Sequence, residues 1–168
     1  MAHLLIGPAA ASGKVGFDLL LVAHVLCAVL GFGALVTTAI QAWRLGAVPV
    51  PTDGLRRYFA PGTNWAGRAI YGVPIFGWAL LVDSGGSLRL SDAWAAAGLG
   101  LWATAALAAE LVVWPAERRV QRAFAAADDL SGPPRASIAR DAKLLVVLGQ
   151  LLGAIFVAGT VLMVSRPG

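Results

Sequence analysis

This sequence has few charged residues, a single cysteine and two histidines. Asp, Glu, Lys and Arg make up 13% of its 168 residues, about half the share found in an average soluble domain. Because Cys27 has no second cysteine to pair with, no disulfide can form within the chain. Sets of cysteines and histidines at metal-binding spacings are also missing. These shortages exclude a soluble enzyme and a secreted disulfide scaffold.

Apolar surface is what the chain has in excess. Its hydrophobic share is 58% and its mean hydropathy is +0.75. A soluble domain of this size could not bury so much apolar surface, whereas a helix of about 20 apolar residues crosses a bilayer. We therefore predict an all-α integral membrane protein, with residues 1–168 forming one domain built as a four-transmembrane-helix bundle.

The predicted spans are about 17–43, 66–83, 93–114 and 144–165, as divided by charged residues and prolines. The second is the weakest, because only 14 uncharged residues separate Arg68 from Asp83. It can cross only if the Arg68 side chain reaches the head groups. We expect this helix to be kinked at Pro74 and the third span to be stopped by Pro115.

Basic residues are distributed unevenly along the chain. Ten of the thirteen Lys and Arg residues fall in the connections 44–68 and 115–143. Since cytoplasmic loops collect such residues, both connections are predicted inside and both termini outside. The expected location is the bacterial plasma (inner) membrane, as a multi-pass protein surrounded by lipid. The net charge of +4 follows from this layout and gives no reason to expect nucleic acid.

Small and polar residues mark the faces on which membrane helices pack. In the first span such residues recur every three or four positions and share one side of a helix: His24, Cys27, Gly31, Ala34, Thr38 and Gln41. In the last span, Gly149 and Gly153 have the spacing that lets two helices approach closely. Packing within the chain is the favoured interpretation of this pair, and a dimer face is the alternative.

Four polar residues are expected to form a structural layer toward the inner side: Gln41, Arg68, Glu110 and Gln150. A lone carboxylate at that depth is costly, so a pair between Glu110 and Arg68, or between Glu110 and the loop arginines, is favoured. The alternative is a transporter-like oligomer in which Glu110 faces a pore and handles protons or ions. No second acid accompanies Glu110 within the spans, which weakens a relay.

His24 lies about seven residues, or roughly 10 Å, from the outer end of the first span. The favoured interpretation is a hydrogen bond across the bundle. The alternatives are an axial ligand to haem b, or a copper site that includes Cys27. A haem with two axial histidines from one chain is not expected, because the only other histidine is His3 in the N-terminal arm.

Three short stretches carry a resemblance to a known family. They are Leu20–Ala34 (LLVAHVLCAVLGFGA), Trp114–Arg119 (WPAERR) and Leu162–Gly168 (LMVSRPG). Together they resemble a bacterial integral-membrane family catalogued as domain of unknown function 2269, and this likeness covers nearly the whole chain. The resemblance implies four helices in the inner membrane and no established activity. More distantly, the opening helix is similar to copper-resistance D-type proteins and to the haem-binding bacterial protoporphyrinogen oxidase, a likeness that carries over His24 alone.

The sequence therefore favours a non-catalytic membrane protein that acts by binding, as an accessory subunit or partner of a larger membrane assembly. Catalytic triads, phosphate-binding loops and paired intramembrane carboxylates are missing from the sequence, and no cofactor is expected. The competing class is a haem- or copper-binding redox protein that uses His24. The expected partner is another membrane protein or, in a homo-oligomer, a second copy of this chain.

The predicted topology can be tested by labelling single cysteines from the outer side of the membrane, in a chain whose Cys27 has been replaced by serine. A cysteine at Ser87 should react with a membrane-impermeant reagent, and one at Ser131 should not, because the basic loops stay inside. The reverse pattern would overturn the orientation.

Overall fold

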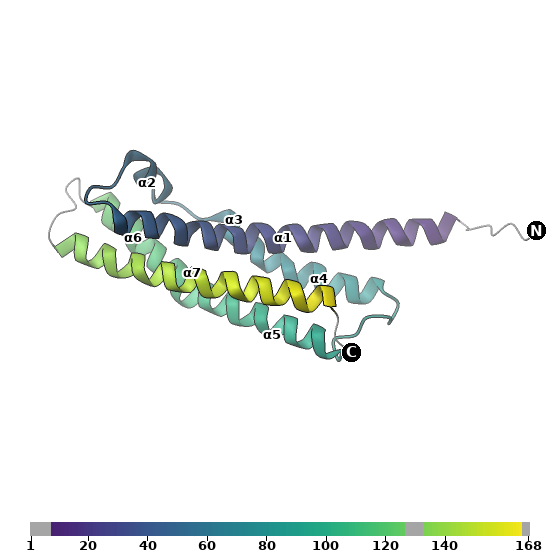
Figure 1. Ribbon diagram of the computed structural model, residues 1–168. Coiled ribbons are helices and arrows are strands. Elements are labelled where there is room, and N and C mark those ends of the chain that lie inside the picture. The colour runs from purple at the N-terminus through teal and green to yellow at the C-terminus, as the bar shows by residue number, and fades with distance from the viewer. Residues whose placement is uncertain (1–7, 127–132, 166–168) are drawn as a thin grey trace, which may run out of the picture.

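The computed structural model describes the backbone of residues 8–126 and 133–165, and the side chains of 14–126 and 135–165. The described chain is all helical (Figure 1), and it contains four helical segments long and apolar enough to cross a membrane. These segments are Lys14–Ala47, Trp65–Asp83, Ala93–Ala126 and Arg135–Ser165. The predicted all-α, four-helix membrane architecture is confirmed.

The first and last helices pack against each other along the bundle. Helix α1 is Pro8–Ala47 and α7 is Pro133–Ser165, and they make the most extensive contact in the molecule. A Cβ added to Gly149 would collide with the side chain of Ala39, and one at Gly153 would lie 3.5 Å from Val36. The two glycines thus let α7 approach α1, which confirms packing within the chain.

The second span is built from three pieces: α3 (Trp65–Arg68), the 3₁₀ turn η1 (Ala69–Tyr71) and α4 (Gly72–Asp83). Asn64 begins it as an N-cap, its Oδ1 accepting the Gly67 N–H at 3.1 Å. Pro74 is the third residue of α4, a position whose N–H would have no partner within that helix. The irregular turn therefore precedes the proline, and a kink at Pro74 stays a prediction.

The third span continues past Pro115, contrary to the expectation that this residue stops it. Helix α5 (Ala93–Ala108) runs through a π-helical turn, η2 (Ala109–Val113), into α6 (Trp114–Ala126) without a break. A proline ring clashes with the carbonyl four residues before it in a regular α-helix. The wider π-helical turn directly before Pro115 relieves that clash, so the helix extends beyond the predicted span.

The two ends of the bundle differ. The beginning of α1, the end of α7 and the α4–α5 connection lie at one end, which we call the outer end after the predicted topology (Figure 1). The opposite, inner end holds α2 (Asp53–Tyr58), α6 and the start of α7. There the Nη2 and Nε groups of Arg119 donate hydrogen bonds to the buried Asp141 of α7, at 2.8 and 3.0 Å. This bidentate ion pair fixes α6 against α7.

The tightly packed core lies toward the inner end. Its fully buried side chains come from every inner segment and include Leu35, Leu45, Phe59, Ile70, Val120, Leu145 and Leu152. Phe59 follows α2 directly, so the first connection folds back into the bundle and contributes to its core. In the outer half, α4 packs on α1 but has little contact with α5, which leaves space between them.

Alanine substitutions at two glycines of α1 should affect stability differently, because only one of the glycines contacts the second span. A Cβ on Gly31 would lie 2.6 Å from the backbone nitrogen of Ile70, whereas a Cβ on Gly33 meets nothing within 4 Å. We expect Gly31→Ala to lower the free energy of unfolding by about 1–3 kcal/mol, as overpacking does. Gly33→Ala should be neutral or stabilising by up to about 1 kcal/mol, because alanine favours helix.

Unfolding of both variants in mixed micelles by increasing SDS measures the difference. Equal stabilities would contradict the close approach at Gly31.

Candidate functional site

A large apolar cavity occupies the outer half of the bundle, between α1, α4, α5 and α7. Its volume is about 840 Å³, within the range of small-molecule sites in proteins. Aromatic residues form much of its wall: Phe17, Phe32, Trp78, Trp94, Trp102 and Phe156. Among the described residues that line it, none is acidic, lysine or arginine. The cavity therefore suits an uncharged, apolar occupant.

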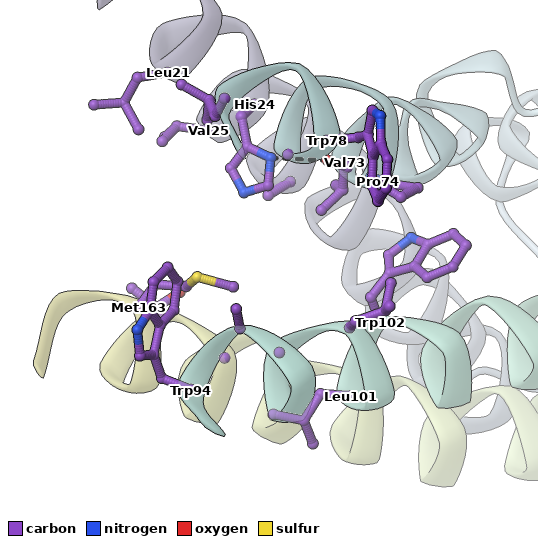
Figure 2. Close-up of a pocket in the computed structure, with 18 of the residues that line it drawn as sticks. Leu21, His24, Val25, Val73, Pro74, Trp78, Trp94, Leu101, Trp102 and Met163 are labelled. Atoms are coloured by element: carbon purple, nitrogen blue, oxygen red, sulfur yellow. Dashed lines mark hydrogen bonds between the residues drawn. The ribbon is translucent and has the colours of Figure 1, made fainter. Parts of the chain in front are cut away.

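His24 is the most polar side chain in the cavity wall. Its Nδ1 lies 2.8 Å from the carbonyl oxygen of Val73, so α1 is hydrogen-bonded to α4 across the bundle. Gly77 makes room for the ring, because a Cβ at that position would lie 3.2 Å from the histidine Cε1. Figure 2 shows the second ring nitrogen pointing away from Val73, into the space between α4 and the wall that carries Trp94 and Met163.

Trp102 contributes to the cavity wall and is hydrogen-bonded to the second span. The carbonyl of Ile70 accepts a backbone N–H at the end of the 3₁₀ turn. The indole Nε1 of Trp102 donates to the same carbonyl at 2.9 Å, because a carbonyl oxygen has two lone pairs. This bond fixes Trp102 against the second span.

A copper site that includes His24 and Cys27 stays a prediction. The Cys27 sulfur packs against Gly72, where an added Cβ would collide with it, and His24 contacts the next residue, Val73, and Gly77. Within the described side chains there is no group of three or more His, Cys, Asp and Glu residues that could hold a metal ion. Cys27 thus contributes to helix packing in this arrangement.

The predicted layer of polar residues forms only in part. Arg68 Nη1 lies 2.9 Å from Glu110 Oε1, and the Tyr71 hydroxyl donates to the same oxygen. The Arg68 guanidinium also stacks on the Trp114 ring, 3.6 Å from its centroid. Glu110 projects from the π-helical turn η2, so the feature that accommodates Pro115 also presents this carboxylate.

Gln41 and Gln150 do not join that layer. Gln41 is half-buried and Gln150 is exposed, and neither side chain hydrogen-bonds to a described residue. Gln150 follows Gly149, which faces α1, so its own side chain projects elsewhere on α7. Their membership of the layer is therefore not supported by a contact between the side chains.

The structure also contains a small polar pocket at the inner end, which no sequence motif marked. Its volume is about 230 Å³, and its lining includes Tyr58, Thr63, Asn64, Glu117 and Gln121. Beside it, the hydroxyls of Thr38 and Tyr58 lie 2.8 Å apart. Burial raises the pKa of the Tyr58 hydroxyl, and its hydrogen bond with Thr38 opposes the rise. The pocket depends on the folding of the 44–64 connection, which sequence periodicity does not describe.

Comparison with known proteins gives one match. The profile of a family described as "Predicted integral membrane protein (DUF2269)" matches residues 18–167, which is nearly the whole chain. No curated protein matches the sequence, and no solved structure does. The family expected from the three short stretches is therefore confirmed, while the likeness to copper-resistance D-type proteins stays a prediction.

The pairing of Arg68 with Glu110 predicts a non-additive double substitution. Arg68→Ala leaves a carboxylate without its cation in an apolar setting, at a cost on the order of 2–3 kcal/mol. Glu110→Gln should suppress part of that destabilisation, because a neutral amide needs no cation. The suppression is partial, since Arg68→Ala also removes the stack on Trp114.

Unfolding free energies of the wild type, both single variants and the double variant measure the coupling. Purely additive effects would show that this ion pair does not hold the layer together.

Proposed function

The chain belongs to the DUF2269 family of predicted integral membrane proteins, and we propose that it acts by binding a lipid-soluble molecule in its outer cavity. The proposal keeps the non-catalytic, accessory role favoured by the sequence. It adds a site to that role, because the molecule is held inside the bilayer by α1, α4, α5 and α7. The bacterial inner membrane, with both termini outside, is the location we propose.

The observation that carries this proposal is the cavity itself. About 840 Å³ of space, open on one side, is lined almost entirely by apolar and aromatic side chains with His24 among them. Concave apolar sites with a few polar groups are typical of small-molecule binding. A partner helix, about 10–12 Å across with its side chains, would need a groove along the full span. The cavity ends instead at the tightly packed core of the inner half.

A haem-binding redox protein is the second candidate, and one observation favours it. Histidines that ligate metals commonly donate their other ring N–H to a carbonyl, as His24 does to Val73. The surroundings fit a haem less well. The described lining offers no cation for the haem carboxylates, and the Met163 methyl group packs against Gly98. These features favour the binding of an uncharged molecule over haem.

The transporter alternative has less support than either. Glu110 would have to face a pore, yet in this chain it accepts hydrogen bonds from Arg68 and Tyr71. Its charge is thus balanced within the protomer.

Filling the cavity should abolish binding. Gly159 lines the cavity, and a Cβ at that position meets nothing within 4 Å. Gly159→Phe should therefore direct a ring into the cavity, since the first side-chain atom has open space. Ala158→Phe is the matched control, because Ala158 is exposed and does not line the cavity. The readout is tryptophan fluorescence, since three of the six tryptophans belong to the wall.

With 1-bromododecane as a quencher in lipid nanodiscs, the wild type and Ala158→Phe should show saturable quenching. Gly159→Phe should show only the linear quenching that the bilayer produces. Identical curves for all three proteins would contradict the proposal.

The redox alternative is tested by the visible absorption spectrum of the purified protein. We expect purified protein to show no Soret absorbance and His24→Gln to retain the fold, because glutamine can replace the hydrogen bond to Val73 but ligates haem poorly. An absorption spectrum and a thermal melt of each protein decide this. A Soret band that disappears in His24→Gln would promote the redox protein over the binding protein.

A further inference from the structure

We propose that the molecule held in the outer cavity carries a hydroxyl group on an otherwise apolar body, and that this hydroxyl donates a hydrogen bond to His24 Nε2. This inference rests on the proposed function. It specifies the polar group of the ligand, whereas the apolar wall specifies only an apolar body.

The first step is the position of the proton on the imidazole. The partner of Nδ1 is the carbonyl oxygen of Val73, at 2.8 Å. A carbonyl oxygen can only accept, so Nδ1 must carry the hydrogen.

The second step is the charge of the ring. An imidazolium would be costly in an apolar setting without an anion. None of the described residues in the cavity wall is acidic, and the Glu110 carboxylate accepts hydrogen bonds from Arg68 and Tyr71 elsewhere. His24 is therefore neutral, and with its proton on Nδ1 its Nε2 is a hydrogen-bond acceptor.

The third step concerns the other polar groups of the wall. Trp102 donates its N–H to Ile70 at 2.9 Å, and the Thr160 hydroxyl donates to the carbonyl of Phe156 at 2.8 Å. Trp78 is 61% exposed and lies at the rim. His24 Nε2 has no partner among the described residues, and it faces the interior of the cavity (Figure 2).

Together these steps define the ligand. An acceptor in an apolar wall selects a donor, because a molecule without one would leave Nε2 unpaired. A carboxylate offers no donor and would find no cation in the wall. A neutral alcohol or phenol with a long or multi-ring apolar body fits both the acceptor and the cavity.

The test compares 12-bromododecan-1-ol with its methyl ether, which has the same chain and bromine but no hydrogen to donate. Binding of each is measured by saturable tryptophan quenching in nanodiscs, for the wild type, His24→Gln and His24→Phe. The affinity ratio of alcohol to ether in His24→Phe gives the difference that membrane partitioning alone produces. His24→Gln keeps both a donor for Val73 and an acceptor for the ligand.

We expect the ratio in the wild type to exceed the ratio in His24→Phe by about five-fold, the effect of one hydrogen bond. His24→Gln should retain most of that preference. If both probes bind and the ratio is the same in all three proteins, the hydroxyl proposal is wrong and the binding function stands. If neither probe quenches the wild type saturably, the binding function itself is wrong.

A second measurement needs no variant. In wild-type protein labelled with ¹⁵N-histidine, the alcohol should shift the Nε2 resonance of His24 and the ether should not. The absence of a shift at saturating alcohol would overturn the proposal even if His24→Phe failed to fold.

Discussion

The close approach of α1 to the second span is the constraint on which the rest of this structure depends. At each of three contacts a glycine lets the partner residue approach closely: Gly31 with Ile70, Gly72 with Cys27, and Gly77 with His24. In a bilayer, helices associate by such packing and by hydrogen bonds, since lipid tails are as apolar as leucine. Because α4 is held to α1, it stays apart from α5, and the outer cavity lies in that gap.

Two irregular turns, each followed by a proline, position neighbouring side chains. The 3₁₀ turn before Pro74 presents the Ile70 carbonyl, which also accepts the indole N–H of Trp102 and so holds a tryptophan in the cavity wall. Pro115 is accommodated by a π-helical turn that presents Glu110 to Arg68 and Tyr71. Since backbone groups in hydrocarbon must find partners inside the protein, each irregularity orders a neighbouring side chain.

Much of this arrangement can be predicted from the sequence, because long apolar runs and helical periodicity are local signals. They identify the four spans, the packing face of α1 and the Gly149 and Gly153 contact. They also predict that Glu110 pairs with Arg68 or with the loop arginines, and the structure shows Arg68. The position of a residue along a span does not determine which way its side chain points, and Gln150, expected in the polar layer, is exposed and has no contact with Arg68 or Glu110. The cavity and the inner pocket around Glu117 arise from how separate segments fold together, as Phe59 shows by entering the core from a connecting loop. The prediction that Pro115 ends the third span was wrong because a π-helical turn, which accommodates the proline, has no simple sequence signature.

The central claim is that the outer cavity is a binding site for a small apolar molecule. Native mass spectrometry of the protein purified from its own membrane tests it most directly, since the bare chain has a mass of 17.3 kDa. The account predicts a one-to-one adduct that survives removal of detergent from the wild type and is missing when the cavity is filled. A bare chain in both proteins, or the same adduct in both, would contradict it.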